Sequence, residues 1–206
     1  MPRVSEEHLE RRRQQILDAA RRCFARKGFH ETSMQDVFAE SGLSAGAVYR
    51  YFNSKDDLIG ALASQTTVTL RALMTELIRS EPLPPPDVLV AALAEHVTAR
   101  SGPDDPLRLV PQAWALALVH PDAAEYVKEA ILAIRNCWYE YTERMRDAGW
   151  LPADADIHAV ATAIMGVIPG FMLQHLIIGD IDPQTLARGL RTLLPYGPPP
   201  DPPRTA

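Results

Sequence analysis

The chain has 206 residues, of which 47% are apolar, so it is long enough for one large or two small domains with a buried core. A net charge of −5 is unusual for a protein that binds nucleic acid, but the charge is unevenly distributed. Residues 1–55 hold ten Lys or Arg against seven Asp or Glu, a net +3, whereas residues 56–206 hold eleven against nineteen, a net −8. The N-terminal quarter is therefore the part suited to a polyanion.

Several classes of site are disfavoured by what the sequence lacks. Cys23 and Cys137 lie far apart without metal-ligand spacing, so we expect two buried, inert thiols and predict no metal and no cofactor. The N-terminal Met-Pro-Arg is followed by charged residues rather than by a signal peptide, which predicts a cytoplasmic protein. No paired nucleophile and base, phosphate loop or HExxH-like set is present, and we therefore predict no enzymatic activity.

The first predicted helix precedes residue 32 and combines an apolar stripe with a basic surface. Its apolar residues recur at helical spacing: Leu9, Ile16, Leu17, Ala20 and Phe24. Its basic residues are Arg11, Arg12, Arg13, Arg21, Arg22, Arg26 and Lys27. We interpret most of these as a solvated face, with one or two in reach of a phosphate backbone.

Residues 32–58 predict two short helices joined by a tight turn and followed by a third helix. Ser33 is a preferred N-cap for the first, with Asp36 in its first turn, and Gly42 ends it. Ser44 can cap the next helix, predicted from residue 45 to 52, and Ser54 the one after.

The second short helix has two different faces. Val48 and Phe52 are four residues apart and form an apolar face, whereas the opposite face shows Ala45, Gly46, Tyr49 and Arg50. Small residues allow close approach to a groove floor, and the Tyr and Arg can reach phosphates or base edges. This pattern predicts a helix-turn-helix that reads double-stranded DNA.

The motifs F-A-x-x-G-F-x-x-T-S-M and G-L-S-x-G-A-V-Y-R-Y-F-x-S-K-D-D-L closely resemble the tetracycline-repressor (TetR) family of bacterial regulators. The resemblance is specific over about residues 10–60 and architectural beyond them. It implies that six residues hold phosphates, namely Thr32, Ser33, Ser44, Tyr49, Tyr51 and Lys55, and that four face the bases, namely Ala45, Gly46, Ala47 and Arg50. Two positions depart from the family: Ala45 replaces a frequent Lys, Arg or Pro, and Phe38 replaces a common Ala.

A simpler interpretation of the same residues is packing, with Tyr49 and Tyr51 on a small helical core and Lys55 as a solvated cap. Arg50 is the strongest candidate for a direct reader, because a guanidinium can pair bidentately with guanine.

The remaining sequence predicts only helices. We expect helices over residues 56–80, 87–100, 107–119 and 122–148, with the proline-rich segment 81–87 between the first two. Pro111 lies in a first turn or marks a kink. The long helix 122–148 has one apolar stripe: Val127, Ala130, Ile131, Ile134, Trp138, Tyr141 and Met145. The expected fold is all-α, with a three-helix DNA-binding head at 1–55, a ligand-binding and dimerisation bundle at 56–195, and a disordered Pro-rich tail at 196–206.

Residues 159–179 contain no Asp, Glu, Lys or Arg and are about long enough to cross a membrane. No basic cluster anchors either end, and Gln174 and His175 would be costly in lipid. Burial on two sides, by its own domain and by a second copy, is the better interpretation and predicts a homodimer without a membrane. By resemblance, the last two long helices form the dimer interface, with these candidates: Ile164, Ile168, Phe171, His175, Ile178, Leu186, Leu190 and Leu193. Pro169 should kink the segment, and the kink either opens a ligand site or follows the core.

Candidate walls of a pocket for a small-molecule effector combine apolar and a few polar residues: Leu93, His96, Val97, Gln112, Trp114, Leu118, Ile134, Trp138, Tyr141 and Met172. Their aromatic content favours an apolar or aromatic ligand, although aromatic stripes on helices are more often core.

The sequence thus predicts a dimeric regulator, by resemblance a repressor, that a small molecule releases from a palindromic operator. The alternatives are a helical enzyme or ligand carrier with an incidental helix-turn-helix, and a membrane-tethered DNA-binding sensor.

Overall fold

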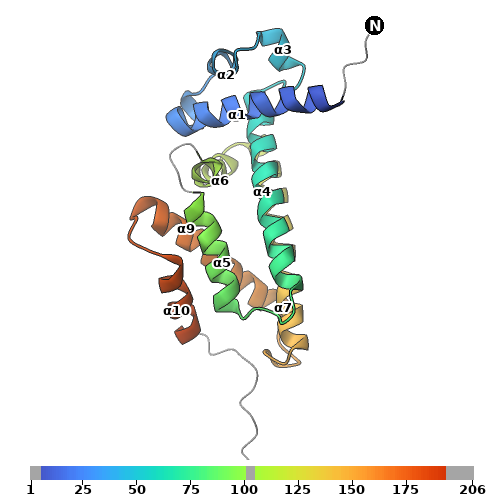
Figure 1. Cartoon of the computed structure of the whole chain (residues 1–206), viewed down its shortest axis with the longest axis vertical. Coiled ribbons are helices and arrows are strands. Elements are labelled where there is room, and N and C mark those ends of the chain that lie inside the picture. Colours follow the sequence, from blue (N-terminus) through green and yellow to red (C-terminus); the bar gives the residue numbers. More distant parts are fainter. Residues whose placement is uncertain (1–5, 101–104, 194–206) are drawn as a thin grey trace, which may run out of the picture. The chain divides into compact units, whose positions relative to one another are not determined.

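The computed structural model describes residues 6–100 and 105–193, and within these ranges every regular element is a helix. The all-α fold predicted from the sequence is therefore confirmed, whereas the tail predicted at 196–206 lies outside the described residues. In chain order (Figure 1) the elements are α1 (Glu6–Glu31), α2 (Met34–Ser41), α3 (Ala45–Tyr49), α4 (Lys55–Arg79), α5 (Pro86–Ala99), the 3-10 helix η1 (Pro106–Leu109), α6 (Val110–Ala117), α7 (Pro121–Asp147), α8 (Ile157–Met165), α9 (Val167–Ile177) and α10 (Pro183–Leu193).

Most predicted boundaries agree with the structure because they rest on local signals. The helices predicted at 56–80, 87–100 and 122–148 are α4, α5 and α7, each displaced by one residue. The helix predicted at 107–119 is divided into η1 and α6, and Pro111 lies in the first turn of α6. A proline is tolerated there because the first turn of a helix has no use for its missing N–H.

Residues 159–179 do not form one straight helix. Gly166 separates α8 from α9, and its N–H donates to the carbonyl of Ala163, three residues back. Pro169, which lacks an N–H, follows in the first turn of α9. The regular helix is thus interrupted at Gly166, three residues before Pro169, and a kink caused by Pro169 stays a prediction.

The described residues contain one helical stretch, Ile157–Ile177, that is long and apolar enough to cross a membrane by length and composition. Only 28% of its most apolar window is buried within the chain. The core helix of a soluble protein can meet the same criterion, so the stretch is weak support for a membrane span. It does show that this part of the chain presents an extensive apolar surface.

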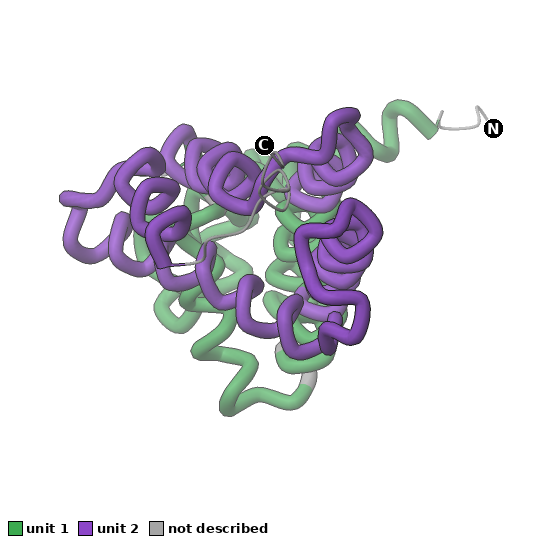
Figure 2. The backbone as a smooth tube through the Cα atoms, turned by 90° about the horizontal axis from the view of Figure 1, so that it is seen from below, with its two compact units in different colours: residues 1–68, 100–130 green, residues 69–99, 131–206 purple. Residues whose placement is uncertain are grey.

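The chain packs as two compact units (Figure 2). Unit 1 comprises residues 1–68 and 100–130, and unit 2 comprises residues 69–99 and 131–206, so α4 and α7 each contribute to both. Unit 1 thus contains the expected head, residues 1–55, together with the start of α4, η1, α6 and the start of α7. A functional boundary at residue 55 stays a prediction.

The core of unit 1 joins the first four helices to α6. Phe24, Val37, Val48 and Leu58 are buried in it, one from each of α1 to α4. Leu109, Ala113, Leu116 and Val127 belong to the same cluster. The small N-terminal helices therefore share one core with η1, α6 and α7.

The core of unit 2 is built around α7. Trp138, Tyr141 and Met145 are at most 2% exposed and pack with Leu93 of α5 and Ile164 of α8. The hydroxyl of Tyr141 donates to the carbonyl of Pro84, 2.7 Å away, so this buried aromatic has its polar atom satisfied. Within the predicted stripe of α7, Ile131 is 39% exposed and so is not part of the buried core.

Candidate nucleic-acid interface

Two side-chain caps define α2 and α3. The hydroxyl of Ser33 accepts the N–H of Asp36, and the Asp36 carboxylate accepts the N–H of Ser33, which makes a complete capping box. Gly42 ends α2 in the left-handed conformation, with φ 67°, where a side chain would be strained. Ser44 then caps α3 by accepting the N–H of Ala47. All three signals were predicted from the sequence and are confirmed.

The two faces of α3 differ as the sequence predicts. Val48 is fully buried and Phe52 is 4% exposed, whereas Ala45, Gly46, Tyr49 and Arg50 are exposed and Ala47 is half-buried. The helix is shorter than predicted, ending at Tyr49 instead of Phe52, because the N–H groups of Tyr51 and Phe52 both donate to the carbonyl of Val48. The chain thus turns away directly after Tyr49, and the small residues and Arg50 remain accessible.

Phe38 supports the side chain of Tyr49. The two rings meet edge to face, with centroids 5.4 Å apart, and Tyr49 is still 45% exposed. The phenylalanine at position 38 therefore limits the freedom of an exposed tyrosine next to Arg50. Tyr51 is half-buried and packs against the core of unit 1.

Ion pairs between α1 and α2 engage much of the basic surface of α1. Lys27 Nζ lies 2.6 Å from Asp36 Oδ1, and Arg22 and Arg26 contact the two carboxylate oxygens of Glu40 at 2.6 and 2.5 Å. The ammonium group of Lys27, and then the N–H and hydroxyl of Ser33, hold the pKa of Asp36 well below its usual range. Arg26 and Arg22 likewise lower the pKa of Glu40. These cations hold α2 on α1 and are not a freely solvated face.

The end of α1 is fixed by two residues that the sequence assigned to phosphate contacts. Gly28 has φ 76° and breaks the regular helix, leaving carbonyl groups without helical partners. The hydroxyl of Thr32, which is 2% exposed, donates to the carbonyl of Gly28 at 2.8 Å, and Lys55 Nζ donates to that of Phe29 at 2.6 Å. Sequence reasoning missed the role of Lys55 because Lys55 and Phe29 are 26 residues apart, whereas the contact of Thr32 with Gly28 spans only four residues.

The entry to α4 is capped as predicted. Ser54 Oγ accepts the N–H of Asp57, and the Asp57 carboxylate accepts the N–H of Asn53 at 2.9 Å. The segment that leaves α3 is therefore tied to the first turn of α4.

Arg50 is the exposed cation of this surface. Its guanidinium has no ion pair or hydrogen bond with the part of the chain that the structure describes, and it follows α3 directly. This surface combines the small side chains of Ala45 and Gly46 with the long side chain of Arg50, which carries N–H donors. Such a combination suits the major groove of DNA.

Comparison with known proteins identifies the family. The family model "Bacterial regulatory proteins, tetR family" matches residues 16–62. The HTH-type transcriptional repressor AcnR of Corynebacterium diphtheriae is 37% identical over an alignment of 202 residues, which covers 88% of this chain and 90% of that protein. The chain belongs to the TetR family.

Two further similarities differ in extent. The HTH-type transcriptional repressor Rv1474c of Mycobacterium tuberculosis is 45% identical over 73 residues, so the match spans 35% of this chain and only 39% of that repressor. The solved structure of FadR from Bacillus subtilis, in complex with stearoyl-CoA, has a TM-score of 0.72 at 18% identity and covers 88% of this chain and 96% of that one. The second similarity shows a shared fold only.

The predicted effector-pocket residues of this TetR-family chain are divided between the two units. Gln112, Trp114 and Leu118 belong to unit 1 and the other seven to unit 2, and Leu118 is 88% exposed. Five are buried core residues at 3% exposure or less: Leu93, Val97, Trp138, Tyr141 and Met172. His96 and Ile134 are half-buried. For the aromatic members the packing interpretation is the better description of this structure, and the pocket stays a prediction.

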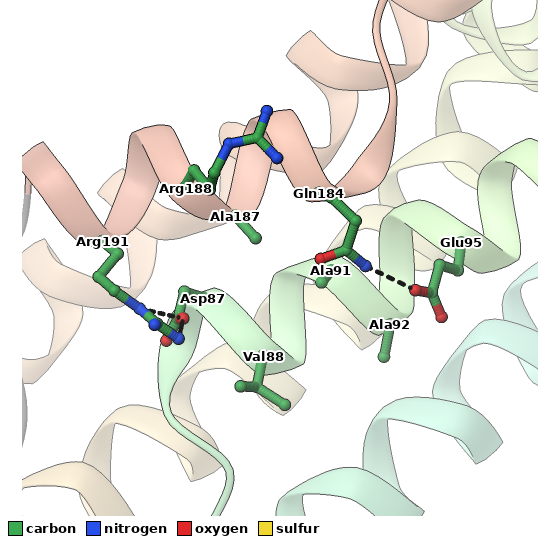
Figure 3. A pocket seen from close by; sticks show the side chains of 9 residues that line it. All are labelled: Asp87, Val88, Ala91, Ala92, Glu95, Gln184, Ala187, Arg188 and Arg191. Atoms are coloured by element: carbon green, nitrogen blue, oxygen red, sulfur yellow. Dashed lines mark hydrogen bonds and ion pairs between the residues drawn. The ribbon is translucent and has the colours of Figure 1, made fainter.

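A groove of about 350 Å³ lies between α5 and α10 in unit 2 (Figure 3) and is lined by none of those residues. Arg191 Nε contacts Asp87 Oδ2 at 2.7 Å at one end, and Gln184 donates to Glu95 at 3.1 Å at the other. Ala91 and Ala187 lie between these two contacts. The groove is lined by charged and small residues without an aromatic, so it differs from the site expected for an apolar effector.

The predicted dimer residues divide into buried and exposed sets. Ile164, Phe171 and Leu190 are at most 7% exposed inside unit 2, and Ile168, His175 and Leu186 are half-buried. The exposed members are Ile178 at 63% and Leu193 at 79%, and they are accompanied by Leu173 and Ile177, which the sequence analysis had not selected. We call Leu173, Ile177, Ile178 and Leu193 the apolar face.

The described residues contain no group of three or more His, Cys, Asp or Glu side chains that could hold a metal ion. Cys23 and Cys137 are buried and free, and burial raises the pKa of both thiols. Thiols in this protonated state are poor nucleophiles.

Proposed function

We propose that the protein is a dimeric transcriptional repressor that binds a palindromic operator through α3 and is released by a small apolar or aromatic molecule. The observation that carries the DNA-binding part is the exposed face of α3, where Ala45, Gly46 and Arg50 lie on a helix fixed by Ser44 and by its buried Val48. Repression is supported by the similarity over most of the chain to the repressor AcnR.

We assign the residues of the head to three roles. Ala45, Gly46, Ala47 and Arg50 face the bases, with Arg50 pairing with guanine. Ser33, Ser44, Tyr49 and Tyr51 contact phosphates from around the same helix. Thr32 and Lys55, which the resemblance also assigns to phosphates, hold the end of α1 through their contacts with the carbonyls of Gly28 and Phe29.

A dimer is supported by the apolar face of α9 and α10. Ile177 and Leu193 are 77% and 79% exposed, and only 28% of the neighbouring apolar window is buried. Exposed isoleucine and leucine side chains are stabilised by burial against a second copy. Two heads related by a two-fold axis read half-sites about 34–36 Å apart, which gives a selectivity that one short helix lacks.

A ligand releases the protein from DNA only if its affinity for the conformation that binds DNA differs from its affinity for the conformation that does not. The similarly folded FadR of Bacillus subtilis is known in complex with stearoyl-CoA, which supports a small-molecule site in the helical body here. We assign that site to unit 2, where α5, α7 and α8 enclose an apolar core.

The apolar stretch Ile157–Ile177 leaves a second candidate, a membrane-tethered DNA-binding sensor. Two observations favour the dimer: the stretch is divided at Gly166, and it includes Gln174 and His175. We propose a cytoplasmic protein, which predicts that the purified chain stays in solution without detergent. Recovery only in the membrane fraction would support the sensor instead.

The test of the proposed function is fluorescence anisotropy with tiled duplexes from the region upstream of the protein's own coding sequence. We expect saturable binding to one fragment and loss of binding on addition of members of a panel of apolar and aromatic molecules. Binding to all fragments with equal affinity would contradict an operator, and binding unchanged by every compound would contradict release by such ligands.

A further inference from the structure

Gly60 lies in the second turn of α4, and the ring of Tyr126 covers its α-carbon. A methyl group on Gly60 would lie 2.9 Å from Cγ and Cδ1 of Tyr126 and 3.0 Å from Cδ2. Real Cβ atoms essentially never approach other atoms this closely. Because Cγ is fixed near the backbone of α7, any side chain at position 60 must displace the tyrosine. A glycine inside a helix lowers helix stability relative to alanine, so its presence fits a site where two helices must approach closely.

Buried neighbours hold this contact in place. Ile59 and Leu62 of α4 are 3% and 5% exposed, and Val127 of α7 is 7% exposed, all in the core of unit 1. Tyr126 itself is 40% exposed, so it lies at the edge of that core. The position of α7 on α4 is therefore fixed by packing on one side and by the ring on Gly60 on the other.

The first turn of α4 is also hydrogen-bonded to the end of α1 and to the segment after α3. Lys55 donates to the carbonyl of Phe29 at the end of α1, and Asp57 accepts the N–H of Asn53 in the segment after α3. Gly60 follows Asp57 by three residues. A displacement of α4 at Gly60 is therefore passed to the end of α1 and to the exit of α3.

We propose that Gly60 and Tyr126 are a positioning pair that sets the orientation of α3 for operator binding. The proposal rests on the proposed DNA-binding function and adds a site of control within it. α7 contributes residues to both units, and Tyr126 lies in the part of α7 that belongs to unit 1 together with the head.

The experiment compares wild type, Gly60→Ala, Tyr126→Ala and the double variant in anisotropy titrations with the operator fragment and with a random duplex of equal length. We expect Gly60→Ala to lower operator affinity about tenfold, because the displaced ring shifts α4 and with it α3, and to leave random-duplex affinity within about twofold. The double variant has room for the methyl group and should return to the affinity of Tyr126→Ala. Tyr126→Phe keeps the ring, so Gly60→Ala/Tyr126→Phe should bind as weakly as Gly60→Ala.

Three results would contradict either the positioning role or the proposed DNA-binding function. Operator affinity unchanged in Gly60→Ala, with or without a lower melting temperature, would make the contact purely structural and overturn the positioning role. The positioning role is also overturned if the double variant Gly60→Ala/Tyr126→Ala binds the operator more weakly than Tyr126→Ala does. If Gly60→Ala does not fold, Tyr126→Trp, which enlarges the ring over an unchanged glycine, takes its place with the same expectation. If wild type binds neither duplex, the proposed function itself is overturned and the positioning role with it.

Discussion

Lys55 Nζ lies 2.6 Å from the carbonyl oxygen of Phe29, so the first residue of α4 closes the end of α1. The ammonium group also reaches the carbonyl of His30 at 3.5 Å. A side chain that resembles a phosphate ligand in the sequence thus acts within the fold, at a point where Gly28 has interrupted the helix.

Replacing Lys55 should therefore affect stability more than the electrostatics of binding. We expect Lys55→Met to lower the free energy of unfolding by about 1–2 kcal/mol, because it leaves helix-end carbonyls without their charged donor. The slope of log affinity against log salt should stay unchanged. Chemical denaturation and titrations at several salt concentrations measure the two quantities; a slope reduced by about one unit would show that Lys55 holds a phosphate.

Replacing Arg50, in contrast, should affect the sequence preference of DNA binding and leave stability unchanged. Arg50→Ala is expected to leave the melting temperature unchanged, since its guanidinium has no partner in the described chain, and to relax preference at one base position by about 1–3 kcal/mol. A binding selection with randomised duplexes measures that preference. Arg11→Ala, another exposed arginine, is the control and should leave the selected sequence unaltered; an identical selected sequence for Arg50→Ala would remove Arg50 as a reader.

Asp36 should contribute to acid sensitivity. Lys27 and Ser33 lower its pKa in the folded state below the ordinary value of 3.8, so the unfolded chain binds more protons at acid pH. The resulting stability is complete above that ordinary pKa and is lost as the pH falls through the folded pKa. We expect Asp36→Asn to be less stable than wild type at neutral pH and to lose less stability below about pH 4.

Thermal melts across that pH range test the Asp36 prediction. Lys27→Met, which removes the largest cause of the shift, should flatten the profile in the same direction. Glu40 also has a lowered pKa, so part of the acid loss should persist in both variants. Profiles parallel to wild type would show that the capping box does not set the acid sensitivity.

The apolar face should control assembly. Ile177→Glu or Leu193→Glu places a charge where burial against a second copy is proposed, and we expect either variant to be monomeric in sedimentation experiments. Both residues are more than three-quarters exposed, so the fold of each chain should be retained. Val68→Glu on α4, at 61% exposure but outside the apolar face, should sediment as wild type does. A dimer retained in both face variants would place the interface elsewhere.

The features predicted well from the sequence are those set within a few residues. Ser33, Gly42 and Ser44 define the ends of α2 and α3 through contacts that span two or three residues, and Val48 identifies the buried face by its spacing. The end of α3 was predicted three residues too late because Phe52 continues the apolar spacing of Val48 beyond the regular helix, into the turn where Tyr51 and Phe52 both donate to the carbonyl of Val48.

What the sequence could not supply depends on long-range contacts. The role of Lys55 follows from where α1 ends in space, and periodicity does not report that position. The segment 159–179 is apolar on every side, so spacing alone could not separate buried Phe171 from exposed Ile177. For the same reason, aromatic residues proposed as pocket walls, such as Trp138, prove to be core.

The central claim is that two copies of the α3 surface read one palindrome. A binding selection with the purified wild-type protein, followed by measurement of the mass of the protein on the selected duplex, tests it most directly. We predict an inverted repeat whose half-sites are about 34–36 Å apart, occupied by an even number of chains. Enrichment of a single half-site bound by one chain, or of no sequence at all, would contradict it.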